Sequence, residues 1–302
     1  MINSLSIIIC TKDRILEVAR CIKAIYSANY PSQVPFIEII VIDDGIVPGA
    51  LLECLKDNVP ACFEYRYVQN TDSHGLFQSR LLGINTAKGD ILLFLDDDVE
   101  IANDYLERLA NDFLDYPYVG GIGGIDILLS VKSLFQIYQF IFFMASFKPG
   151  RLTASGYSGS LSKWIHQSQP FFSEYLSGCN MAFRKKAVDT LKNIEWLKGY
   201  SLGEDLALSY FVRKKYVLLV DPRLHVFHRL SKRSREGDEI LARSRIINHY
   251  QLLKLYNARQ INYLAFYWTF FGYIILDLAH PSRWRLIPLY LKDLRNGALT
   301  NQ

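Results

Sequence analysis

Three consecutive carboxylates, Asp96, Asp97 and Asp98, are the strongest chemical signal in the chain, because they directly follow the hydrophobic run Ile91–Leu95. Adjacent negative charges at the end of a buried segment are costly unless a cation or water balances them. A divalent cation bound to a diphosphate would supply that balance, since hard cations prefer oxygen ligands and retain substrate phosphates. The alternative is a solvated turn in which Asp98 caps the helix predicted to follow it.

Two further positions offer acid–base or ligand chemistry. Glu204 and Asp205 open an apolar, helix-like segment, where a carboxylate would serve as a general base toward a hydroxyl group. Acidic residues are also ordinary at helix starts, which leaves a purely structural interpretation open. His228 ends an apolar run, and its imidazole would suit Mn²⁺. With His225 close by, the alternative is a structural histidine held by hydrogen bonds.

The elements that position these residues alternate between strands and helices. Buried strands are predicted from runs of apolar, β-branched residues, and helices from apolar residues at helical spacing. This alternation indicates a mostly parallel, twisted sheet with helices on both faces, in which ligands bind beyond the carboxyl ends of the strands. The predicted strands are Leu5–Cys10, Phe36–Ile42, Phe63–Val68 and Ile91–Leu95; the predicted helices are Arg14–Ala28, Leu51–Lys56 and Leu76–Ala87.

The rest of the chain continues the mixed pattern and then becomes helical. A charged linker after His228 is expected to lead into helices that run from about Ile240 to the end, including Ile261–Ala279. Before the linker, we expect a helix at Val99–Tyr116, a strand at Val119–Leu128, a short aromatic helix at Phe135–Phe147, a loop at Gly150–Gln169, and strands at Glu174–Arg184 and Tyr216–His228 around a helix at Glu204–Lys214.

Charge is unevenly distributed along the 302 residues, whose formal net charge is +4. Residues 223–302 carry 13 Lys and Arg against 5 Asp and Glu, beside the most apolar stretch of the chain. This combination favours an anionic membrane surface as partner over nucleic acid. The five scattered cysteines match neither a disulfide framework nor a zinc module, and the start does not resemble a signal peptide. We therefore expect a cytoplasmic protein, peripheral on the inner face of the cell membrane.

Four ordered blocks of residues carry a family resemblance over roughly residues 4–230. The chain resembles family 2 glycosyltransferases of the GT-A (Rossmann-like) fold, whose Asp-rich "DXD" turn corresponds to Asp96–Asp98. Three departures are Ile46 where a serine is usual, Leu81 where an asparagine is common, and a turn at Asn70–Gly75 that is longer than usual. The blocks are Ser6–Arg14 with Val41–Gly45; Asn70–Gly75, Arg80 and Ala87–Asp98; Ser177–Arg184; and Gly203–Leu208 with Val220–Pro222 and Val226–His228.

The resemblance implies a role for each matching residue. Asp205 would be the catalytic base, Asp98 and His228 would hold Mn²⁺ or Mg²⁺, and Asp43 would accept a hydrogen bond from a pyrimidine N–H. Arg80 would approach the base or diphosphate, and Asp96 the ribose or sugar hydroxyls. The donor-binding set is Thr11, Asp13, Asp43, Arg80, Asp96 and Asp97; the acceptor-binding set is Gly178, Asn180 and Glu204.

The resemblance also implies an organisation and an activity. Residues 1–98 would form the nucleotide-sugar half of a GT-A domain, residues 99–230 the acceptor half, and residues 231–302 a helical, membrane-associating region. The enzyme would move a sugar, with inversion, from a UDP-, dTDP- or GDP-sugar to a glycan or polyprenyl-linked acceptor, as in cell-surface polysaccharide synthesis. The alternatives are a nucleotidyltransferase, which would need a glycine-rich loop where Thr11–Arg14 stands, and a non-catalytic sugar-nucleotide binding module.

The aromatic stretch Ile261–Leu276 is the element expected to meet the membrane. Its 16 residues fall short of the roughly 20 needed to cross a bilayer, and its Tyr and Trp content favours the headgroup region. Basic residues flank it, among them Arg259 and Arg283, and would be attracted to anionic lipid. The alternatives are a core helix that covers the sheet edge and a true membrane span.

Overall fold

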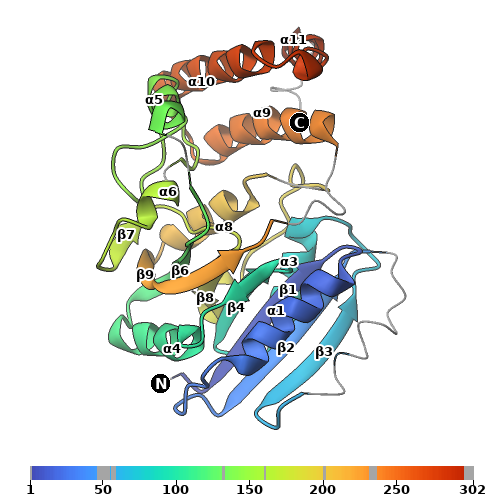
Figure 1. The fold of residues 1–302 in the computed structure, drawn as a ribbon, viewed down its shortest axis with the longest axis vertical. Coiled ribbons are helices and arrows are strands. Elements are labelled where there is room, and N and C mark those ends of the chain that lie inside the picture. Colours follow the sequence, from blue (N-terminus) through green and yellow to red (C-terminus); the bar gives the residue numbers. More distant parts are fainter. Residues whose placement is uncertain are drawn as a thin grey trace.

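The parallel half of the sheet forms as predicted. The computed structural model describes residues 2–45, 55, 59–130, 133–159, 161–199, 202–230 and 237–295. Its first four strands are parallel and lie in the order β3-β2-β1-β4 (Figure 1). Because Thr11 lies opposite Asp43 and Cys10 opposite Asp96, the carboxyl ends of β1, β2 and β4 meet at one edge. The strands are β1 (Ser4–Thr11), β2 (Phe36–Asp43), β3 (Phe63–Gln69) and β4 (Ile91–Asp96).

The other half of the sheet is mixed in direction. The described strands here are β5 (Val99–Ile101), β6 (Val119–Asp126), β7 (Phe171–Ser173), β8 (Asn180–Arg184) and β9 (Val217–His228). β8 runs antiparallel between β4 and β6, whereas β6 and β9 are parallel. β5 pairs antiparallel with β9, with Val99 opposite His228. This register brings the end of the chain's longest described strand next to the Asp-rich turn.

Helices cover both faces of the sheet (Figure 1). On one face, α1 (Ile15–Ser27) and α4 (Tyr105–Asp115) pack into one apolar core. On the other face, α3 (Leu76–Thr86) and α8 (Glu204–Arg213) pack into a second core. The α/β architecture expected from the sequence is confirmed.

Several expected boundaries are wrong. Val99–Tyr116 is not one helix, because Val99–Ile101 pairs with β9 as β5 and the helix α4 begins only at Tyr105. Of Glu174–Arg184, only Asn180–Arg184 forms a strand. The aromatic helix is α5 (Ser133–Ile141), and two short helices, α6 (Leu161–Trp164) and α7 (Lys185–Val188), were not expected. The predicted helix Leu51–Lys56, apart from Leu55, and most of the charged linker lie outside the described residues.

The C-terminal helices form a layer with a core of its own. α9 (Asp238–Leu255), α10 (Gln260–Leu278), the 3-10 helix η2 (Pro281–Arg283) and α11 (Leu286–Arg295) follow in that order. Their shared cluster includes Ile246, Phe266, Phe270 and Tyr290. Leu252 of α9 instead packs into the core that contains α8, which joins this layer to the sheet.

A buried histidine at this junction makes the stability of the fold depend on pH. His249 of α9 donates from Nε2 to the carbonyl oxygen of Ser155 at 2.5 Å and lies against the ring of Phe266. Burial lowers the pKa of His249 from 6.5 to about 4, and the Ser155 hydrogen bond opposes part of that shift. Between these two values the unfolded chain binds a proton that the folded chain does not bind. Stability is therefore fully present above pH 6.5 and is lost as the pH falls toward 4.

We expect the free energy of unfolding to fall by about 3 kcal/mol across this window through His249 alone. Urea denaturation at several pH values measures it, with His249→Gln as the comparison, since glutamine can still donate to Ser155. The variant should lose the corresponding part of the pH dependence. Identical pH dependence in the two proteins would show that His249 is not the group responsible.

Candidate active site

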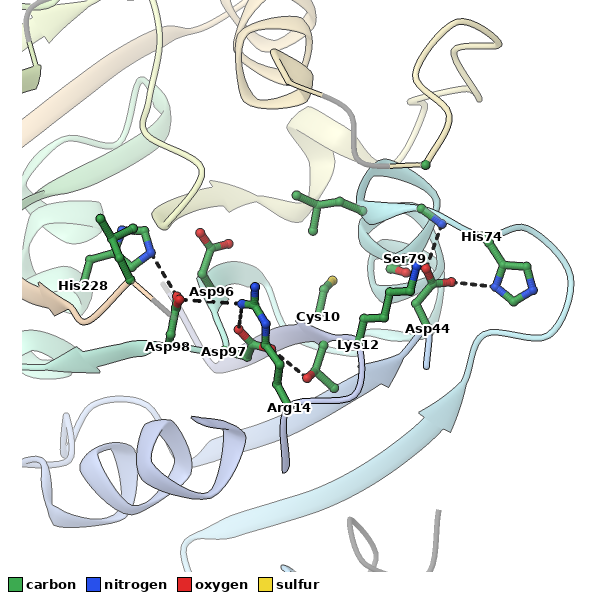
Figure 2. A pocket seen from close by; sticks show the side chains of 15 residues that line it. Cys10, Lys12, Arg14, Asp44, His74, Ser79, Asp96, Asp97, Asp98 and His228 are labelled. Carbon is green, nitrogen blue, oxygen red and sulfur yellow. Dashed lines mark hydrogen bonds and ion pairs between the residues drawn. The ribbon is translucent and has the colours of Figure 1, made fainter. Parts of the chain in front are cut away.

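A first cavity of about 290 Å³ opens where β1, β2 and β4 end (Figure 2). Its wall combines residues of the two turns that follow β1 and β4 with the end of β9. This is the strand edge at which ligands of open α/β sheets bind. The polar residues of the wall are Thr11, Lys12, Arg14, Asp44, His74, Ser79, Asp96, Asp97, Asp98 and His228.

Asp96, Asp98 and His228 form a cluster that could hold a metal ion. One ligand atom from each residue lies within 4.8 Å of the others, and His228 Nε2 is 2.9 Å from Asp98 Oδ1. Two carboxylate oxygens and one imidazole nitrogen are a donor set that suits Mn²⁺, and oxygen donors also suit Mg²⁺. Asp98 does not cap a helix here, because the strand β5 follows it. The predicted pair of ligands, Asp98 and His228, therefore lies together, with Asp96 as a third.

The charge of the cluster is visible in the pKa of His228. Burial lowers that pKa, but hydrogen bonds with Asp98 and Cys179 and the nearby Asp96 carboxylate outweigh burial and raise it from 6.5 to about 11. A proton on His228 thus occupies the place of a cation between these carboxylates. Because a metal ligand must be deprotonated, a bound cation would displace that proton.

Asp97 points away from the cluster and links two loops. Its carboxylate accepts hydrogen bonds from Thr11 Oγ1 at 2.7 Å and from Arg14 Nη1 at 2.9 Å. Burial raises the pKa of Asp97 to about 6, although the Arg14 guanidinium lowers it. Both Thr11 and Asp97 were predicted to contact the donor. The structure shows both in the wall of the first cavity, held to each other.

Asp43 and Asp13 are placed differently from expectation. Asp43 is fully buried, and its carboxylate accepts hydrogen bonds from the Gly45 N–H and the Tyr67 hydroxyl, so it does not reach the first cavity. Asp44 lines that cavity instead. Asp13 also does not line the cavity. Its backbone is left-handed, with φ 56°. It packs against Gly45, and a Cβ added to Gly45 would lie 2.6 Å from the backbone nitrogen and from Oδ1 of Asp13.

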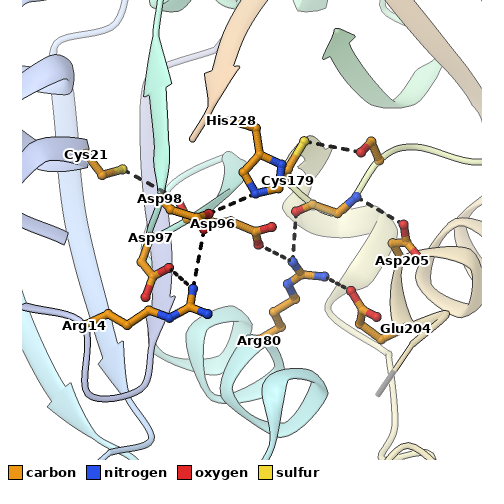
Figure 3. A network of polar contacts seen from close by, with 12 residues as sticks. Arg14, Cys21, Arg80, Asp96, Asp97, Asp98, Cys179, Glu204, Asp205 and His228 are labelled. Atoms are coloured by element: carbon orange, nitrogen blue, oxygen red, sulfur yellow. Dashed lines mark hydrogen bonds and ion pairs between the residues drawn. The ribbon is translucent and has the colours of Figure 1, made fainter. Parts of the chain in front are cut away.

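Arg80 is buried between the two halves of the site (Figure 3). Its guanidinium contacts Glu204 Oε1 at 2.5 Å, Asp96 Oδ1 at 3.1 Å and the Gly178 carbonyl oxygen at 2.9 Å. It was predicted to approach the nucleotide, but it does not line the first cavity. Three short contacts to protein groups make Arg80 a brace between the Asp-rich turn and the start of α8.

A second cavity of about 300 Å³ adjoins the first. The two share Leu76, Asp96 and His228 in their walls. Gly178, Glu204 and Asp205, all predicted from the sequence, line the second cavity. Its apolar wall is formed by Leu129, Tyr157, Leu161, Trp164 and Leu202.

Asn180, also predicted for this region, lies behind the wall and not in it. It is fully buried, and its side-chain amide has no hydrogen-bond partner among the residues that the structure describes. An added Cβ at Gly124, which does line the cavity, would lie 3.0 Å from the Asn180 amide nitrogen. Asn180 therefore faces the backbone that forms the cavity wall.

The start of α8 holds Asp205 toward the second cavity. Gly203 precedes the helix with φ 94°, a conformation that favours glycine, and an added Cβ would also lie 2.9 Å from Leu252. Asp205 accepts hydrogen bonds from the Leu206 N–H at 2.8 Å and the Gly178 N–H at 3.2 Å. Burial raises the pKa of Asp205, while Arg80 and the two N–H groups lower it. A carboxylate with a raised pKa is a stronger proton acceptor.

Sequence reasoning missed several residues of both cavities. Arg14 and Lys12 follow β1, so their position directly after a strand was a usable signal. His74 and the Asp44 carboxylate lie 2.9 Å apart at the rim of the first cavity. Trp164 and Tyr157 come from a polar segment that was expected to be a plain loop, and no local pattern marks them.

Comparisons with known proteins agree with this geometry. The family model "Glycosyl transferase family 2" matches residues 6–191. Mouse (Mus musculus) polypeptide N-acetylgalactosaminyltransferase 6 is 33% identical over 96 residues, which is 30% of this chain and 15% of that protein. The chain thus spans only a small part of the length of the curated relatives it matches.

Two solved structures share the fold at low sequence identity. Mannosyltransferase PcManGT from Pyrobaculum calidifontis, in complex with GDP-Man and Mn²⁺, has a TM-score of 0.58 at 14% identity, over 100% of this chain and 76% of that one. GalNAc-T7 with UDP, GalNAc and Mn²⁺ has a TM-score of 0.60 at 17% identity, over 84% of this chain and 48% of that one. These likenesses identify the GT-A arrangement. Since the family model covers more than half of the chain, the protein belongs to glycosyl transferase family 2.

Proposed function

We propose that this protein transfers a sugar, with inversion and with a divalent cation, from a nucleotide sugar to a hydroxyl group of a glycan or polyprenyl-linked acceptor. One observation carries the proposal. Two cavities of about 300 Å³ meet at Asp96 and His228, and Asp205 lines the second cavity and not the first. A donor in the first cavity and an acceptor in the second would therefore place their reacting atoms at the shared wall.

The first cavity suits the nucleotide diphosphate. When bound by Asp98 and His228, with Asp96 beside them, Mn²⁺ or Mg²⁺ would offset negative charge on the diphosphate as a Lewis acid. Lys12 and Arg14 line the same wall and offer hydrogen-bond donors to phosphate oxygens, while Thr11 beside them donates its hydroxyl hydrogen to Asp97. For the base we propose Asp44 in place of Asp43, because Asp44 reaches the cavity. The bases of UDP, dTDP and GDP each carry a ring N–H group that can donate a hydrogen bond to a carboxylate, so sugars of all three nucleotides are candidate donors.

Asp205 would act on the acceptor. From the second cavity its carboxylate takes the proton of the attacking hydroxyl as the oxygen approaches the sugar carbon. Because the leaving nucleotide occupies the other cavity, attack from this side inverts the configuration at that carbon. Gly178 holds Asp205 through its N–H and holds Arg80 through its carbonyl group, which keeps the base fixed relative to Asp96.

The second cavity favours a neutral sugar as the acceptor end. Its described lining contains four carboxylates, Asp96, Asp126, Glu204 and Asp205, and no lysine or arginine, so an anionic group would be repelled there. Aromatic and apolar walls with a few polar groups are typical of small-molecule sites. We place the reaction at the cytoplasmic face of the cell membrane, where a soluble donor would meet a lipid-linked acceptor.

The two rival functions lack support in this site. A nucleotidyltransferase would hold the phosphates with a glycine-rich loop, whereas Thr11–Arg14 contains no glycine. A non-catalytic binding module would have no need of a carboxylate in the acceptor cavity, and Asp205 is present and held by two N–H groups.

The test is a panel of UDP-, dTDP- and GDP-sugars assayed for nucleotide release with Mn²⁺, with Mg²⁺ and with excess EDTA. We expect release from one nucleotide class, dependent on a divalent cation, and accelerated by a neutral glycan acceptor. Full nucleotide release in excess EDTA would overturn the proposed requirement for a divalent cation. Transfer of a nucleotidyl group, or binding without release from any donor, would overturn the proposed activity.

The brace Arg80 gives a further prediction. Lysine keeps the positive charge but cannot contact Glu204, Asp96 and Gly178 together, because it lacks the planar guanidinium. We expect Arg80→Lys to lower the kcat of sugar transfer by about 10–100-fold, with a smaller change in the KM for the donor. Arg108→Lys, at an exposed ion pair on α4, is the matched control and should retain the wild-type rate. A wild-type kcat in Arg80→Lys would show that the brace is not needed.

A further inference from the structure

The polarity of α10 is reversed with respect to a helix of a water-soluble protein. Five of its large apolar residues are 42–65% exposed, and their spacing of three, four, three and seven residues places them on one face. These residues are Ile261, Leu264, Trp268, Phe271 and Leu278. Tyr267, also exposed, lies beside this stripe.

Three polar residues of α10 face the protein. Asn262 donates to the carbonyl oxygen of Ala154 at 2.9 Å, and buried Thr269 donates to that of Phe142 at 2.8 Å. Asp277, the acidic residue of α10, is buried and accepts a hydrogen bond from the Tyr290 hydroxyl at 2.8 Å. Such an arrangement exposes hydrocarbon and encloses polar groups, which is unfavourable in water alone.

The exposed surface continues onto α5, which comes from a distant part of the chain (Figure 1). Trp268 Nε1 donates to the Ile141 carbonyl oxygen at 2.7 Å, and its ring stacks on Phe142 with centroids 5.2 Å apart. The Tyr138 hydroxyl donates to the Gly272 carbonyl oxygen at 2.5 Å. Exposed Leu134, Ile137 and Ile141 of α5 extend the stripe, and we call the combined surface the α5–α10 face.

We propose that the α5–α10 face inserts into the headgroup region of an anionic lipid bilayer, with α10 lying in the plane of the membrane. Trp and Tyr on the face are residues that favour this region. Exposed Arg259 precedes α10 and exposed Lys292 follows it, which places positive charge near both ends of the face. Arg285 is also exposed, but it pairs with Asp238 and Glu239 of α9 at 3.8 Å. The exposed apolar stripe of α10 contains no acidic residue. These charges favour anionic lipid over a second copy of the same basic region as the occupant.

The contacts of α10 favour lying flat over crossing. The helix has 19 residues and is apolar enough to span a bilayer by length and composition. Its inward face, however, is bonded to Ala154, Phe142 and Tyr290 from near its beginning to its end. Crossing a bilayer would break these contacts, whereas interfacial insertion retains them. The proposal also ties the membrane contact to α5, an element outside the aromatic tail.

The experiment is flotation of the full chain with phosphatidylglycerol–phosphatidylcholine vesicles and with pure phosphatidylcholine vesicles. We compare Leu264→Gln/Phe271→Gln on α10, Leu134→Gln/Ile137→Gln on α5, and the control Leu16→Gln, which alters a 58% exposed leucine on α1. Each double variant should partition at least about tenfold more weakly than the wild type, because two large apolar side chains no longer enter the lipid. The control should be unchanged, and wild-type tryptophan fluorescence should shift to the blue on binding.

Four outcomes would overturn the proposal. Equal flotation of all proteins would show that the α5–α10 face does not bind the membrane. Weaker flotation of the α10 variant alone would show that α5 does not take part in binding. Membrane binding that resists extraction with carbonate would indicate that α10 crosses the bilayer instead of lying flat in it. Concentration-dependent dimers in the wild type, lost in both double variants without any vesicle binding, would identify a second copy as the occupant. Nucleotide release measured without vesicles in the same variants reports separately on the proposed glycosyl transfer.

Discussion

Replacing Asp205 with asparagine is expected to lower the rate of sugar transfer by about 10²–10⁴-fold, the range of a lost general base. The amide cannot accept the proton of the attacking hydroxyl, but it has nearly the size of the carboxylate. It can also still accept a hydrogen bond from the Gly178 N–H, so the start of α8 should keep its shape. Donor affinity should change little, because Asp205 lines the second cavity and not the first.

Initial rates with saturating donor and acceptor, together with nucleotide-sugar binding measured by calorimetry, separate the two effects. Asp104→Asn is the matched control, since it makes the same chemical change at an exposed ion pair on α4, outside both cavities. It should transfer at the wild-type rate. If Asp205→Asn retained more than about a tenth of wild-type transfer, a different carboxylate of the second cavity, Glu204 or Asp126, would be the base.

The parallel half of the fold could be predicted from sequence because three of its four strands, β1, β2 and β4, are mostly buried on both faces. Such strands must be continuous apolar runs, as in Leu5–Cys10 and Ile91–Leu95, and the helices predicted between consecutive strands favour parallel pairing. The half of the sheet with mixed strand directions was harder to predict from the sequence. β5 is only three residues long and precedes α4 with few residues between, so its hydrophobic pattern merges with that of the helix. Its existence depends on pairing with β9, a contact more than 100 residues away in sequence.

The site divides in the same way. The family resemblance predicted Asp98 and His228 as a pair of metal ligands, and the structure brings them together because Asp98 follows β4 and His228 ends β9 opposite Val99. The sequence could not show which of the two consecutive carboxylates, Asp43 or Asp44, faces the first cavity. Successive residues of a strand point to opposite faces, and Asp43 still belongs to β2. The role of Arg80 depends on Glu204, 124 residues further along the chain, and no local pattern encodes that contact. Likewise, apolar content alone could not show that α10 turns Asn262, Thr269 and Asp277 inward.

Replacing Asp98 with asparagine should lower cation-dependent nucleotide release by about 10²–10⁴-fold at fixed Mn²⁺, since a metal ligand that stabilises leaving-group charge is worth several kcal/mol. The carboxylate supplies both the negative charge and one of the three clustered ligand atoms. Asparagine keeps an oxygen that can accept a hydrogen bond from His228 Nε2, so the pairing of β5 with β9 should survive and the unfolding midpoint should change little.

Removing the Asp98 charge should also lower the pKa of His228, because the hydrogen bond with Asp98 is the largest contribution that raises it. The comparison is Asp97→Asn, in the same turn but bonded to Thr11 and Arg14 instead of facing the cluster. Titrating Mn²⁺ into both variants measures the concentration needed for half-maximal release. That concentration should rise strongly in Asp98→Asn and little in Asp97→Asn, since only Asp98 lies in the cluster. Equal Mn²⁺ requirements in the two variants would place the cation elsewhere than at the cluster of Asp96, Asp98 and His228.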